Sequence, residues 1–428
     1  MNRKPSDKAL FVGIIYNGCG NTRTGIHEAE NHLDELQSLA STLGIENAGR
    51  IIISVKKINP AFLTGKGKVE EIIELAADKE ADMIIFDEEL SASQQRNWEN
   101  RSGVRTIDRQ ELILAIFEQR ATSKEAVVQV ELAKYRYLLP RLKRAWTHLS
   151  RQRGGVSGTK GEGEKQIEID RRIALDRIAR LEKELSELKK HRDTARKKRL
   201  STGVFTCAIA GYTNSGKSTL LNALTGSGTG GSNRLFDTLD PAARKLKLKG
   251  GREIILTDTV GFIRKLPHQL FEAFKSTLEE ALTADMIIIL LDASSPDVSG
   301  SYRVSMEVLN EIGADKKSRL VVFNKIDKCK STADIDLFRR GNREAVMISA
   351  SERINLGSLL YAIEKQVSSG SREINLFIPL RDFSLLQLIR RQGEVIRDRY
   401  TDDGIYVSAL IPEKYIKPFY QYSISKPE

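Results

Sequence analysis

The first 120 residues alternate between short apolar runs and longer amphipathic stretches. The apolar runs have the length and the branched side chains of buried strands, and they span 10–16, 51–55, 83–86 and 104–107. Amphipathic stretches with an apolar residue every three or four positions follow at about 27–43, 66–80, 91–100 and 110–119. This alternation predicts a small α/β domain over residues 1–121, with a largely parallel sheet.

A helical pattern replaces this alternation after residue 121. Apolar residues step by four, three and four positions from Ala126 to Tyr137, and the same steps return from Ala174 to Leu188. Such steps mark the seam of a two-helix coiled coil, and Pro140 should kink the first helix, which extends to about residue 152. Residues 122–200 are therefore predicted to form an antiparallel helical arm with a glycine-rich tip at 154–163.

Apolar runs return in the second half of the chain. They predict buried strands of a doubly wound parallel sheet, in a domain over residues 201–370, and they span 204–210, 254–257, 286–291, 320–323 and 346–348. Beyond Ser369 a strand, a helix and two further strands are expected between about 373 and 421. These predict a small α/β domain over residues 371–428, in which the sequence indicates no chemistry.

The strand at 204–210 runs directly into a glycine-rich loop, and a helix opens at Lys217. A phosphate-binding loop works in this context, because glycines let backbone N–H groups curl around phosphates and the helix N-terminus is partly positive. Lys217 is expected to reach the β- and γ-phosphates, and the Ser218 hydroxyl to ligate Mg²⁺. The loop residues predicted to contact the nucleotide are Gly211, Tyr212, Thr213, Asn214, Ser215, Gly216, Lys217, Ser218 and Thr219.

Two further segments complete the predicted phosphate and magnesium site. Asp258, at the end of a strand, is expected to be an outer partner of Mg²⁺, and Gly261 to offer its N–H to the γ-phosphate. Thr238 would complete the Mg²⁺ shell from a segment that orders when GTP binds. The residues assigned to these segments are Phe236, Asp237, Thr238, Leu239, Asp240, Asp258, Thr259, Val260 and Gly261.

Later strand ends predict which base is bound. The Asp327 carboxylate can accept hydrogen bonds from guanine N1–H and N2–H₂, a pair of donors that adenine lacks. The backbone of Ser349 and Ala350 is expected to clasp guanine O6. The predicted guanine site consists of Asn324, Lys325, Ile326, Asp327, Ser349, Ala350 and Ser351. A single glycine-rich loop could arise by chance, but this ordered series of motifs predicts GTP.

The residue after Gly261 is Phe262, where a Ras-like switch has the glutamine that orients the attacking water. Because phenylalanine cannot hydrogen-bond water, hydrolysis is expected to be slow unless another group or a partner assists. The residues predicted to act on the reaction are Lys217, Thr238 and Gly261. Asn214 is a candidate ligand for K⁺ near the phosphates, and an ordinary polar loop residue is an equal alternative.

Positive charge is concentrated in the predicted arm. The chain has a net charge of +11, and residues 134–199 alone contain 21 Lys or Arg against 9 Asp or Glu. Nucleic acid is the leading partner for such a segment, and a solvated charged helix is the plainer alternative. The residues predicted to bind RNA at the tip are Arg151, Arg153, Lys160, Lys165, Arg171 and Arg172.

Composition excludes several classes of protein. The three cysteines are far apart, which argues against disulfides or a zinc site and suits a reducing cytoplasm. No apolar run is long enough to span a bilayer, and the run at 10–16 is too short for a signal peptide, while peripheral membrane contact stays open.

The segment Gly65-Lys-Gly-Lys is a weak second phosphate-binding candidate, and a helix-capping turn is the stronger alternative.

Several segments resemble HflX, a family of bacterial GTPases in the Obg–HflX superfamily. The resemblance covers nearly the whole chain and includes the phosphate loop, Pro60-Ala-Phe-Leu-Thr-Gly-Lys-Gly, Phe236-Asp-Thr-Leu-Asp-Pro and Asp258-Thr-Val-Gly-Phe-Ile-Arg-Lys-Leu-Pro-His. The tip departs from the family pattern, with Glu162 in place of the usual proline and Lys165 where Thr or Ser is common. Ser351 replaces a common lysine.

The resemblance implies a GTPase that docks on the large ribosomal subunit and contacts rRNA and ribosomal proteins rather than DNA. It implies an arm that reaches toward the peptidyl-transferase centre, splitting of stalled ribosomes under stress, and hydrolysis that the ribosome stimulates. It also implies action as a monomer in the cytoplasm and, for some relatives, secondary use of ATP. Two alternatives stay open: an assembly or RNA-modification GTPase acting on precursor rRNA or tRNA, and a coiled-coil scaffold whose fold GTP locks.

Overall fold

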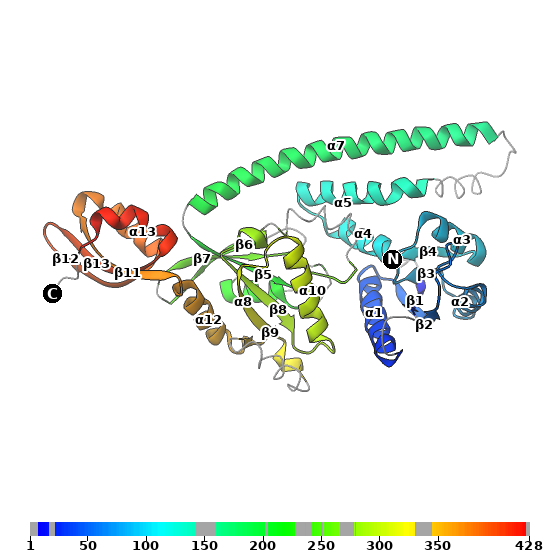
Figure 1. Ribbon diagram of the computed structural model, residues 1–428, viewed down its shortest axis with the longest axis horizontal. Helices are drawn as coiled ribbons and strands as arrows, with labels where there is room; N and C mark the ends of the chain where they lie inside the picture. Colours follow the sequence, from blue (N-terminus) through cyan, green and yellow to red (C-terminus); the bar gives the residue numbers. More distant parts are fainter. Residues whose placement is uncertain are drawn as a thin grey trace, which may run out of the picture. The chain divides into compact units, whose positions relative to one another are not determined.

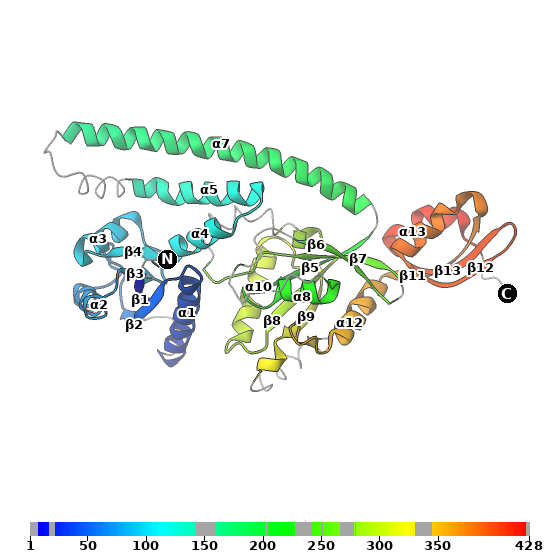
Figure 2. The same ribbon diagram turned by 180° about the vertical axis from the view of Figure 1, so that it is seen from behind.

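The computed structural model describes residues 7–16, 22–142, 160–201, 204–226, 236, 242–249, 251–265, 278, 280–329 and 345–424. The chain divides into two compact units, Met1–Ser186 with Leu266–Ala273 and Glu187–Lys265 with Phe274–Glu428. The first unit contains one sheet and the second contains two (Figures 1 and 2). Within the described residues, no helix is both long enough and apolar enough to cross a membrane.

A parallel four-stranded sheet forms the centre of the first unit. Its strands, in the order β2-β1-β3-β4, are β1 (Lys8–Tyr16), β2 (Glu46–Val55), β3 (Met83–Phe86) and β4 (Arg105–Asp108). The connecting helices are α1 (Thr22–Thr42), α2 (Lys66–Asp78), α3 (Ala92–Ser102) and α4 (Arg109–Arg120). Helices α2 and α3 pack on one face through Val69 and Trp98, and α1 and α4 cover the other. The predicted small α/β fold with a parallel sheet is confirmed.

Local sequence determines where two of these helices begin. At α3 the Ser91 side chain accepts a hydrogen bond from the Gln94 N–H, and the Gln94 side chain accepts one from the Ser91 N–H. At α4 the Asp108 carboxylate accepts a hydrogen bond from the Glu111 N–H at 2.9 Å. Since Asp108 is also the last residue of β4, this cap lies at the carboxyl edge of the sheet.

Helix α5 (Lys124–Leu138) and the first part of α7 (Lys160–Ser201) lie side by side in both views of the chain (Figures 1 and 2). Ion pairs join them, from Lys124 to Glu184 at 2.9 Å and from Arg177 to Glu131 at 2.7 Å. Of the side chains predicted for the seam, Leu185 and Leu188 are half-buried, and those that are fully buried are Ala126, Val130, Ala133, Tyr137, Ala174, Ile178 and Leu181. The two helices therefore bury an apolar stripe against each other.

Pro140 interrupts the helical pattern, as its ring requires. Helix α5 ends at Leu138, and a short 3₁₀ turn, η1 (Leu139–Arg141), contains the proline. The predicted tip is wrong at one end, because α7 already begins at Lys160 and residues 160–163 are helical. The remaining residues predicted for the tip, 154–159, lie outside the described part of the chain.

A six-stranded sheet lies in the second unit, with the order β10-β9-β8-β5-β7-β6. Its strands are β5 (Phe205–Gly211), β6 (Ala243–Lys247), β7 (Glu253–Asp258), β8 (Met286–Asp292), β9 (Ser318–Asn324) and β10 (Val346–Met347). The predicted strands are all parallel, and one further strand that was not predicted, β6, runs antiparallel to β7 at the edge. In β6 only Leu246 is buried, between exposed lysines, and such charged residues are typical of an edge strand.

Helices cover both faces of this sheet, as a doubly wound fold requires. Helices α8 (Lys217–Thr225) and α12 (Leu356–Ser368) share one apolar core, and α10 (Val298–Glu311) packs on the other side of the sheet. A short 3₁₀ turn, η2 (Ile326–Lys328), follows β9. The predicted α/β sheet with its phosphate loop is confirmed as the central fold of this unit.

The C-terminal part of the chain folds into a separate small sheet. Its antiparallel strands, in the order β11-β13-β12, are β11 (Ser371–Pro379), β12 (Glu394–Tyr400) and β13 (Gly404–Pro412). Helix α13 (Ser384–Gln392) packs on one face through Leu386 and Ile389. Short 3₁₀ turns complete the chain: η3 (Leu380–Asp382), η4 (Glu413–Tyr415) and η5 (Lys417–Tyr422).

Candidate nucleotide-binding site

The candidate site lies at the carboxyl edge of the six-stranded sheet. Strand β5 leads into the phosphate loop, β7 ends at Asp258, and β9 ends at Asn324. Because these strands are parallel neighbours or flank β8, their carboxyl ends meet at one edge. Ligands of doubly wound sheets bind at such an edge, so the fold brings the predicted motifs together.

Glycine is required at two positions of the phosphate loop. Gly216 adopts a left-handed conformation with φ 93°, and a Cβ there would lie 2.3 Å from Nδ2 of Asn324. At Gly211 a Cβ would lie 2.2 Å from the backbone oxygen of Leu290. Any side chain would therefore collide with the walls of the loop, and the loop keeps a backbone cradle of the size that phosphate needs.

Lys217 lies buried in the centre of this cradle. Its Nζ donates hydrogen bonds to the backbone oxygens of Tyr212, at 2.9 Å, and Gly211, at 3.2 Å. Burial lowers the pKa of Lys217 to about 8, an effect that the Asp258 carboxylate opposes and the Lys325 charge reinforces. A buried cation without a carboxylate in direct contact is a site prepared for an anionic ligand.

The surroundings of Lys217 fit a phosphate group with Mg²⁺. The Ser218 hydroxyl donates a hydrogen bond to Asp258 at 2.8 Å, so the two expected magnesium partners already lie together. The buried hydroxyls of Thr213 and Ser215 have no hydrogen-bond partner within the described residues, and phosphate oxygens would satisfy both. A Cβ at Gly261 would lie 3.0 Å from Lys217 Nζ, so only glycine leaves that approach open.

The segment that follows Asp258 is hydrogen-bonded to the phosphate loop. The Thr213 N–H donates to the backbone oxygen of Phe262 at 2.7 Å, and the Arg264 N–H donates to the Tyr212 hydroxyl at 3.0 Å. The Phe262 side chain is only 3% exposed and cannot orient water. Residues 259–262 therefore follow the loop closely, with an apolar side chain where a water-orienting amide is expected.

The Arg264 side chain extends this connection to the start of α10. It forms an ion pair with Asp297, which also accepts a hydrogen bond from the Gly300 N–H at 2.8 Å and so caps the helix. Partial burial raises the pKa of Asp297, but the hydrogen bonds from Arg264 and Gly300 and the charges of Arg264 and Arg303 outweigh it and lower the pKa overall. Sequence reasoning missed this contact, because a residue pair 33 positions apart leaves no local pattern.

On the guanine side, one amide organises two loops. Asn324 donates from Nδ2 to the Ser215 backbone oxygen at 2.8 Å and accepts at Oδ1 from the Ala350 N–H at 2.9 Å. Lys325 adopts a left-handed conformation, and its Nζ lies 2.8 Å from Asp292. The Asp327 carboxylate is exposed and has no hydrogen-bond or ion-pair partner within the described residues, which leaves it accessible to a base.

The remaining guanine-side residues form a compact turn. Ser349 is buried and lies 3.2 Å, hydroxyl to hydroxyl, from Ser351, which is exposed. The Glu352 N–H donates to the Ser349 hydroxyl at 3.2 Å. This arrangement fixes the turn in which Ala350 lies, and leaves Ser351 at the surface where the family commonly has lysine.

Several predicted residues lie outside the described part of the chain. They are Asp237, Thr238, Leu239, Asp240, Arg151 and Arg153. Phe236 is described, and is buried with φ 56°. Lys160 and Lys165 lie on α7, where Arg171 and Arg172 are exposed. Since Arg151 and Arg153 lie outside the described residues, the clustering of these basic residues at the tip stays a prediction, and helix geometry places Arg171 about 16 Å along α7 from Lys160.

A polar network in the first unit was also missed by sequence reasoning. Arg141 is buried and donates to the backbone oxygens of Tyr137, at 3.0 Å, and Leu90, at 2.5 Å, while its Nε donates to Gln95 at 3.1 Å. Its guanidinium lies 3.5 Å from Asp108. Burial raises the pKa of Asp108 to about 6, which the Glu111 and Leu90 N–H donors and Arg141 oppose. The network joins the end of α5 to the carboxyl edge of the first sheet.

The fold is a doubly wound sheet with this phosphate loop, the two expected magnesium partners Ser218 and Asp258, and a guanine-side loop. These features define the chain as a P-loop GTPase. Models of known GTPase families match the chain along most of its length. Residues 206–325 match the family described as a 50S ribosome-binding GTPase, residues 30–118 that described as GTP-binding GTPase N-terminal, and residues 120–199 the GTP-binding GTPase middle region. The chain belongs to the HflX family of GTPases.

Individual relatives support this assignment. GTPase HflX of Caldanaerobacter subterraneus is 44% identical over 408 residues, covering 95% of this chain and 92% of the relative. GTPase HflX of Escherichia coli K12 is 38% identical over 373 residues, covering 87% of each. Among solved structures, a GTP-binding protein from Sulfolobus solfataricus in complex with GDP is 28% identical, with a TM-score of 0.44 over 84% of this chain and 98% of that one.

Proposed function

We propose that this chain binds the large ribosomal subunit and splits or rescues stalled ribosomes under stress, as a monomer in the cytoplasm. The observation that best supports RNA contact is the distribution of charge on α7. Glu182 and Glu184 pair with Arg136 and Lys124 of α5, at 2.6 and 2.9 Å, so these acidic groups are engaged with the neighbouring helix. Among the α7 residues whose side chains the structure describes, the exposed basic residues are Arg171, Arg172, Arg180, Lys183, Lys189 and Lys190, and the exposed acidic residues that do not pair with α5 are Glu168, Asp176 and Glu187.

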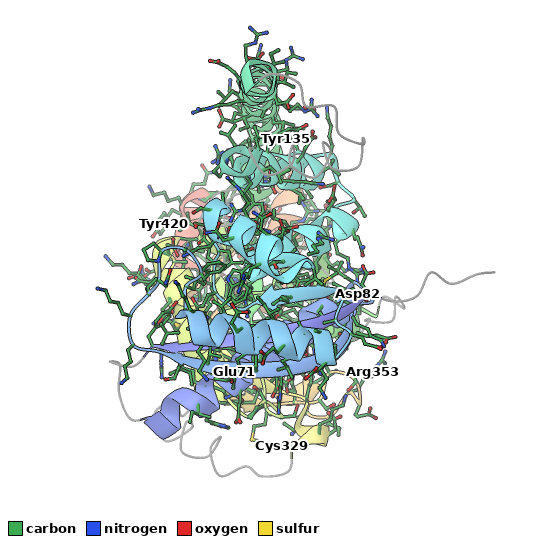
Figure 3. All side chains as sticks on the ribbon, turned by 90° about the vertical axis from the view of Figure 1, so that its right-hand side faces the viewer. Glu71, Asp82, Tyr135, Cys329, Arg353 and Tyr420 are labelled. Carbon is green, nitrogen blue, oxygen red and sulfur yellow. The ribbon has the colours of Figure 1, made fainter. Side chains whose placement is uncertain are left out.

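On this described part of α7 the exposed basic residues outnumber the exposed acidic residues, so its outer surface is net positive. Figure 3 views the chain nearly along α7, whose side chains, many tipped with nitrogen, radiate around the helix. A row of cations on a long exposed helix attracts the phosphate backbone of RNA, and the attraction weakens as salt rises. A helix of 42 residues can follow such a backbone over a length of about 60 Å.

In this proposal the nucleotide site acts as a switch. Lys217 holds the β- and γ-phosphates and Gly261 donates its N–H to the γ-phosphate. Ser218 and Thr238 would ligate Mg²⁺, with Asp258 as its outer partner. Mg²⁺, when bound, neutralises the charge that develops on the phosphates. Because Phe262 cannot orient water, hydrolysis waits for a group that the ribosome brings into place.

The proposal includes Asn214 as a ligand of K⁺. This residue is exposed and has φ 59°, a left-handed conformation that asparagine tolerates well, so the backbone alone is sufficient reason for an asparagine. Replacing Asn214 by Gly keeps the conformation and removes the side-chain oxygen. If K⁺ binds there, turnover by the unaltered chain is faster in K⁺ than in Na⁺, and the difference disappears in Asn214→Gly.

The second phosphate-binding candidate lies at the start of α2. Gly65 is the cap residue of that helix and Lys66 begins it, in the position that a helix-capping turn predicts. Any use of ATP by this chain is therefore proposed to occur through the GTP site. ATP turnover that excess GDP fails to inhibit would contradict this.

Sedimentation with isolated large subunits tests the ribosomal role. The full chain, loaded with a non-hydrolysable GTP analogue, is expected to sediment with large subunits at physiological salt, and the subunits to stimulate GTP turnover. Arg171→Gln with Arg172→Gln should weaken this association. The control is Lys56→Gln with Lys57→Gln, which removes two adjacent exposed cations from the loop after β2.

Three outcomes would favour other functions. Failure of the loaded chain to sediment with large subunits contradicts the ribosomal role. Tighter binding to precursor than to mature subunits indicates an assembly GTPase. Turnover that ribosomes leave unchanged, together with a partner bound equally at low and high salt, indicates a scaffold.

A further inference from the structure

The small C-terminal sheet has one covered face and one open face. Helix α13 covers the face that carries Leu376, Val407 and Ala409. Strand alternation and the cross-strand register place a different set on the opposite side. We call this side the open sheet face, and it consists of Glu373, Asn375 and Phe377 from β11, Arg397 and Arg399 from β12, and Tyr406 and Ser408 from β13.

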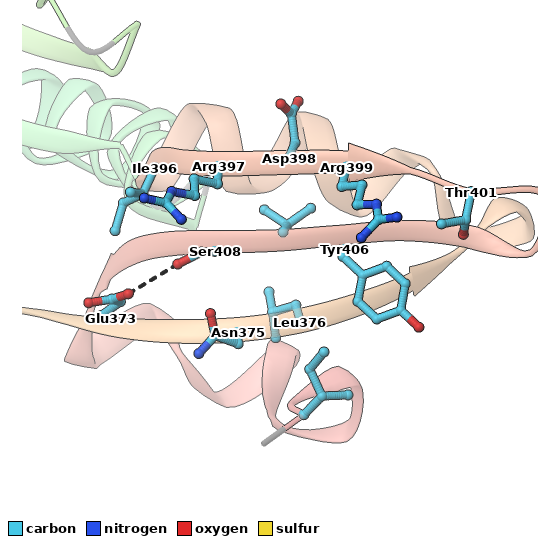
Figure 4. A pocket seen from close by; sticks show the side chains of 12 residues that line it. Glu373, Asn375, Leu376, Ile396, Arg397, Asp398, Arg399, Thr401, Tyr406 and Ser408 are labelled. Atoms are coloured by element: carbon cyan, nitrogen blue, oxygen red, sulfur yellow. Dashed lines mark hydrogen bonds between the residues drawn. The ribbon is translucent and has the colours of Figure 1, made fainter. Parts of the chain in front are cut away.

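The register arranges these side chains in two rows across the sheet. Phe377, Tyr406 and Arg399 are direct cross-strand neighbours, and Asn375, Ser408 and Arg397 form the adjacent row. Figure 4 shows Arg397 and Arg399 projecting from β12, with Tyr406 near Arg399. The hollow measures about 1060 Å³. It is wide and shallow, as a surface for an extended ligand would be.

Two cations of this face are available to a ligand. Arg397 and Arg399 are exposed, and neither has an ion-pair or hydrogen-bond partner within the described residues. Asp398, which lies between them in the strand, points to the covered side and pairs with Arg390 of α13 at 3.1 Å. Strand alternation therefore directs the Asp398 carboxylate away from the open sheet face, while Arg397 and Arg399 lie on it with Cα atoms about 6.6 Å apart along β12.

Aromatic rings lie next to these cations. The rings of Phe377 and Tyr406 have centroids 4.9 Å apart at an interplanar angle of 51°, and Tyr406 is 37% exposed. Arg399 lies directly across from Tyr406. Rings and guanidinium planes are the surfaces on which unpaired bases stack, while guanidinium groups also hold phosphates.

Polar groups in the second row can read the ligand. The Asn375 side chain has no hydrogen-bond partner within the described residues, so its amide can donate to and accept from a base edge or a ribose 2′-hydroxyl. Ser408 donates its hydroxyl hydrogen to Glu373 at 3.1 Å, at the far end of the hollow. The chain covers the outer edge of β11, where the Ile424 N–H donates to the Asn375 backbone oxygen at 2.9 Å, but it leaves the face itself open.

We propose that the open sheet face binds an unpaired segment of RNA. Phosphates would lie on Arg397 and Arg399, bases on Tyr406 and Phe377, and a base edge or ribose hydroxyl at Asn375. A peptide ligand would not supply phosphates to these guanidinium groups. It would also call for apolar pockets rather than a pair of aromatic rings on an open face. This inference extends the proposed ribosomal function by giving the chain a second RNA contact, separate from the basic side of α7.

Binding of the full chain to a fluorescein-labelled 12-nucleotide oligouridylate, and to isolated large subunits, tests this. In Arg397→Gln with Arg399→Gln, the Kd for the oligonucleotide should rise about tenfold, and the slope of log K against log salt should fall by about 1.4, or ~0.7 per phosphate contact. Tyr406→Leu should raise Kd about tenfold with an unchanged slope, because it removes stacking rather than charge. The matched control is Arg372→Gln with Arg381→Gln, which removes the same charge from exposed positions of the same domain.

Photo-crosslinking with a 4-thiouridine oligonucleotide locates the contact. Crosslinks are expected in peptides from β12 and β13, in addition to any in α7. Crosslinks confined to α7, or equal affinity and salt slope for the double variant and its control, would overturn the proposal. So would a double variant that loses large subunits but binds the oligonucleotide normally, since the face would then contact a ribosomal protein. If the unaltered chain fails to bind large subunits but needs Arg397 and Arg399 for the oligonucleotide, the ribosomal function fails and this inference stands.

Discussion

Asn324 and Ser215 are joined by a hydrogen bond of 2.8 Å, in which the buried side-chain amide donates to the backbone oxygen of the phosphate loop. The same side chain accepts from the Ala350 N–H at 2.9 Å. One amide therefore holds the loop for the phosphates and the turn for the base at a fixed separation before any nucleotide binds. Nucleotide affinity should depend on Asn324 even though the residue's hydrogen bonds are to protein.

Asn324→Ala should lower both nucleotide affinity and stability. It leaves a buried carbonyl and a buried N–H without partners, each costing about 1–3 kcal/mol. We expect the Kd for GDP to rise at least about tenfold, and the midpoint of thermal unfolding to fall in the absence of nucleotide. Fluorescent GDP titration and calorimetry measure the two effects. Asn310→Ala removes an exposed amide from α10 and is the control, and equal behaviour of the two variants would contradict the linking role of Asn324.

Phe262→Gln should not create an efficient intrinsic GTPase. Phe262 is buried, and its backbone oxygen is fixed by the Thr213 N–H. A glutamine at this position either stays buried with an amide that costs about 1–3 kcal/mol, or disturbs the segment to reach solvent. Single-turnover hydrolysis without ribosomes should change less than about threefold, while stability falls. Phe262→Leu, which stays apolar, should keep both near normal. A large rate increase in Phe262→Gln would show that the side chain reaches the attacking water.

Much of this architecture could be predicted from the sequence, because its signals are local. Strands such as β3 and β8 are short continuous apolar runs, and the phosphate loop lies where a strand meets a helix. Strand β6 could not be found in this way, since charged residues dominate it and its pairing with β7 depends on tertiary contacts.

The details of the site depend more strongly on contacts between distant residues. The motif predicts that Asn324 belongs to a guanine site, but its bonds to Ser215 and Ala350 follow only from the way the strands meet. The pair of Arg264 and Asp297 and the burial of Arg141 likewise arise from packing. The start of α7 at Lys160 was also not evident from the sequence, because a glycine-rich segment does not show where a helix begins.

Arg141→Met should loosen the base of the arm. The buried guanidinium bonds to Leu90, Tyr137 and Gln95, and removing it leaves these acceptors and the nearby Asp108 without their cation. The expected cost is about 3–5 kcal/mol for a broken buried ionic contact. Hydrogen exchange should speed up in α5 and at the end of β4. Arg136→Met, which removes a surface ion pair worth at most about 1 kcal/mol, is the control, and equal exchange in both variants would contradict the role of Arg141.

The lowered pKa of Lys217 predicts that nucleotide binding takes up a proton. Burial lowers this pKa from 10.5 to about 8, so the free folded chain binds fewer protons than the unfolded chain between these values. The stability of the free chain should therefore rise with pH across this window, as the cost of the buried charge is relieved. Phosphates next to the amine favour its charged form and restore the proton, so affinity for GTP should fall as pH rises above 8.

Titration calorimetry in buffers of different ionisation enthalpy measures this proton directly. More of the free Lys217 is neutral at pH 8.5 than at pH 7, so binding should take up more protons at pH 8.5 than at pH 7. Lys217→Arg stays charged throughout this range, and whatever nucleotide it binds should be bound without pH-dependent uptake. Equal proton uptake by the unaltered chain at pH 7 and pH 8.5 would show that Lys217 keeps its charge in the empty loop, and that the cradle is already polar enough to stabilise a buried ammonium group without phosphate.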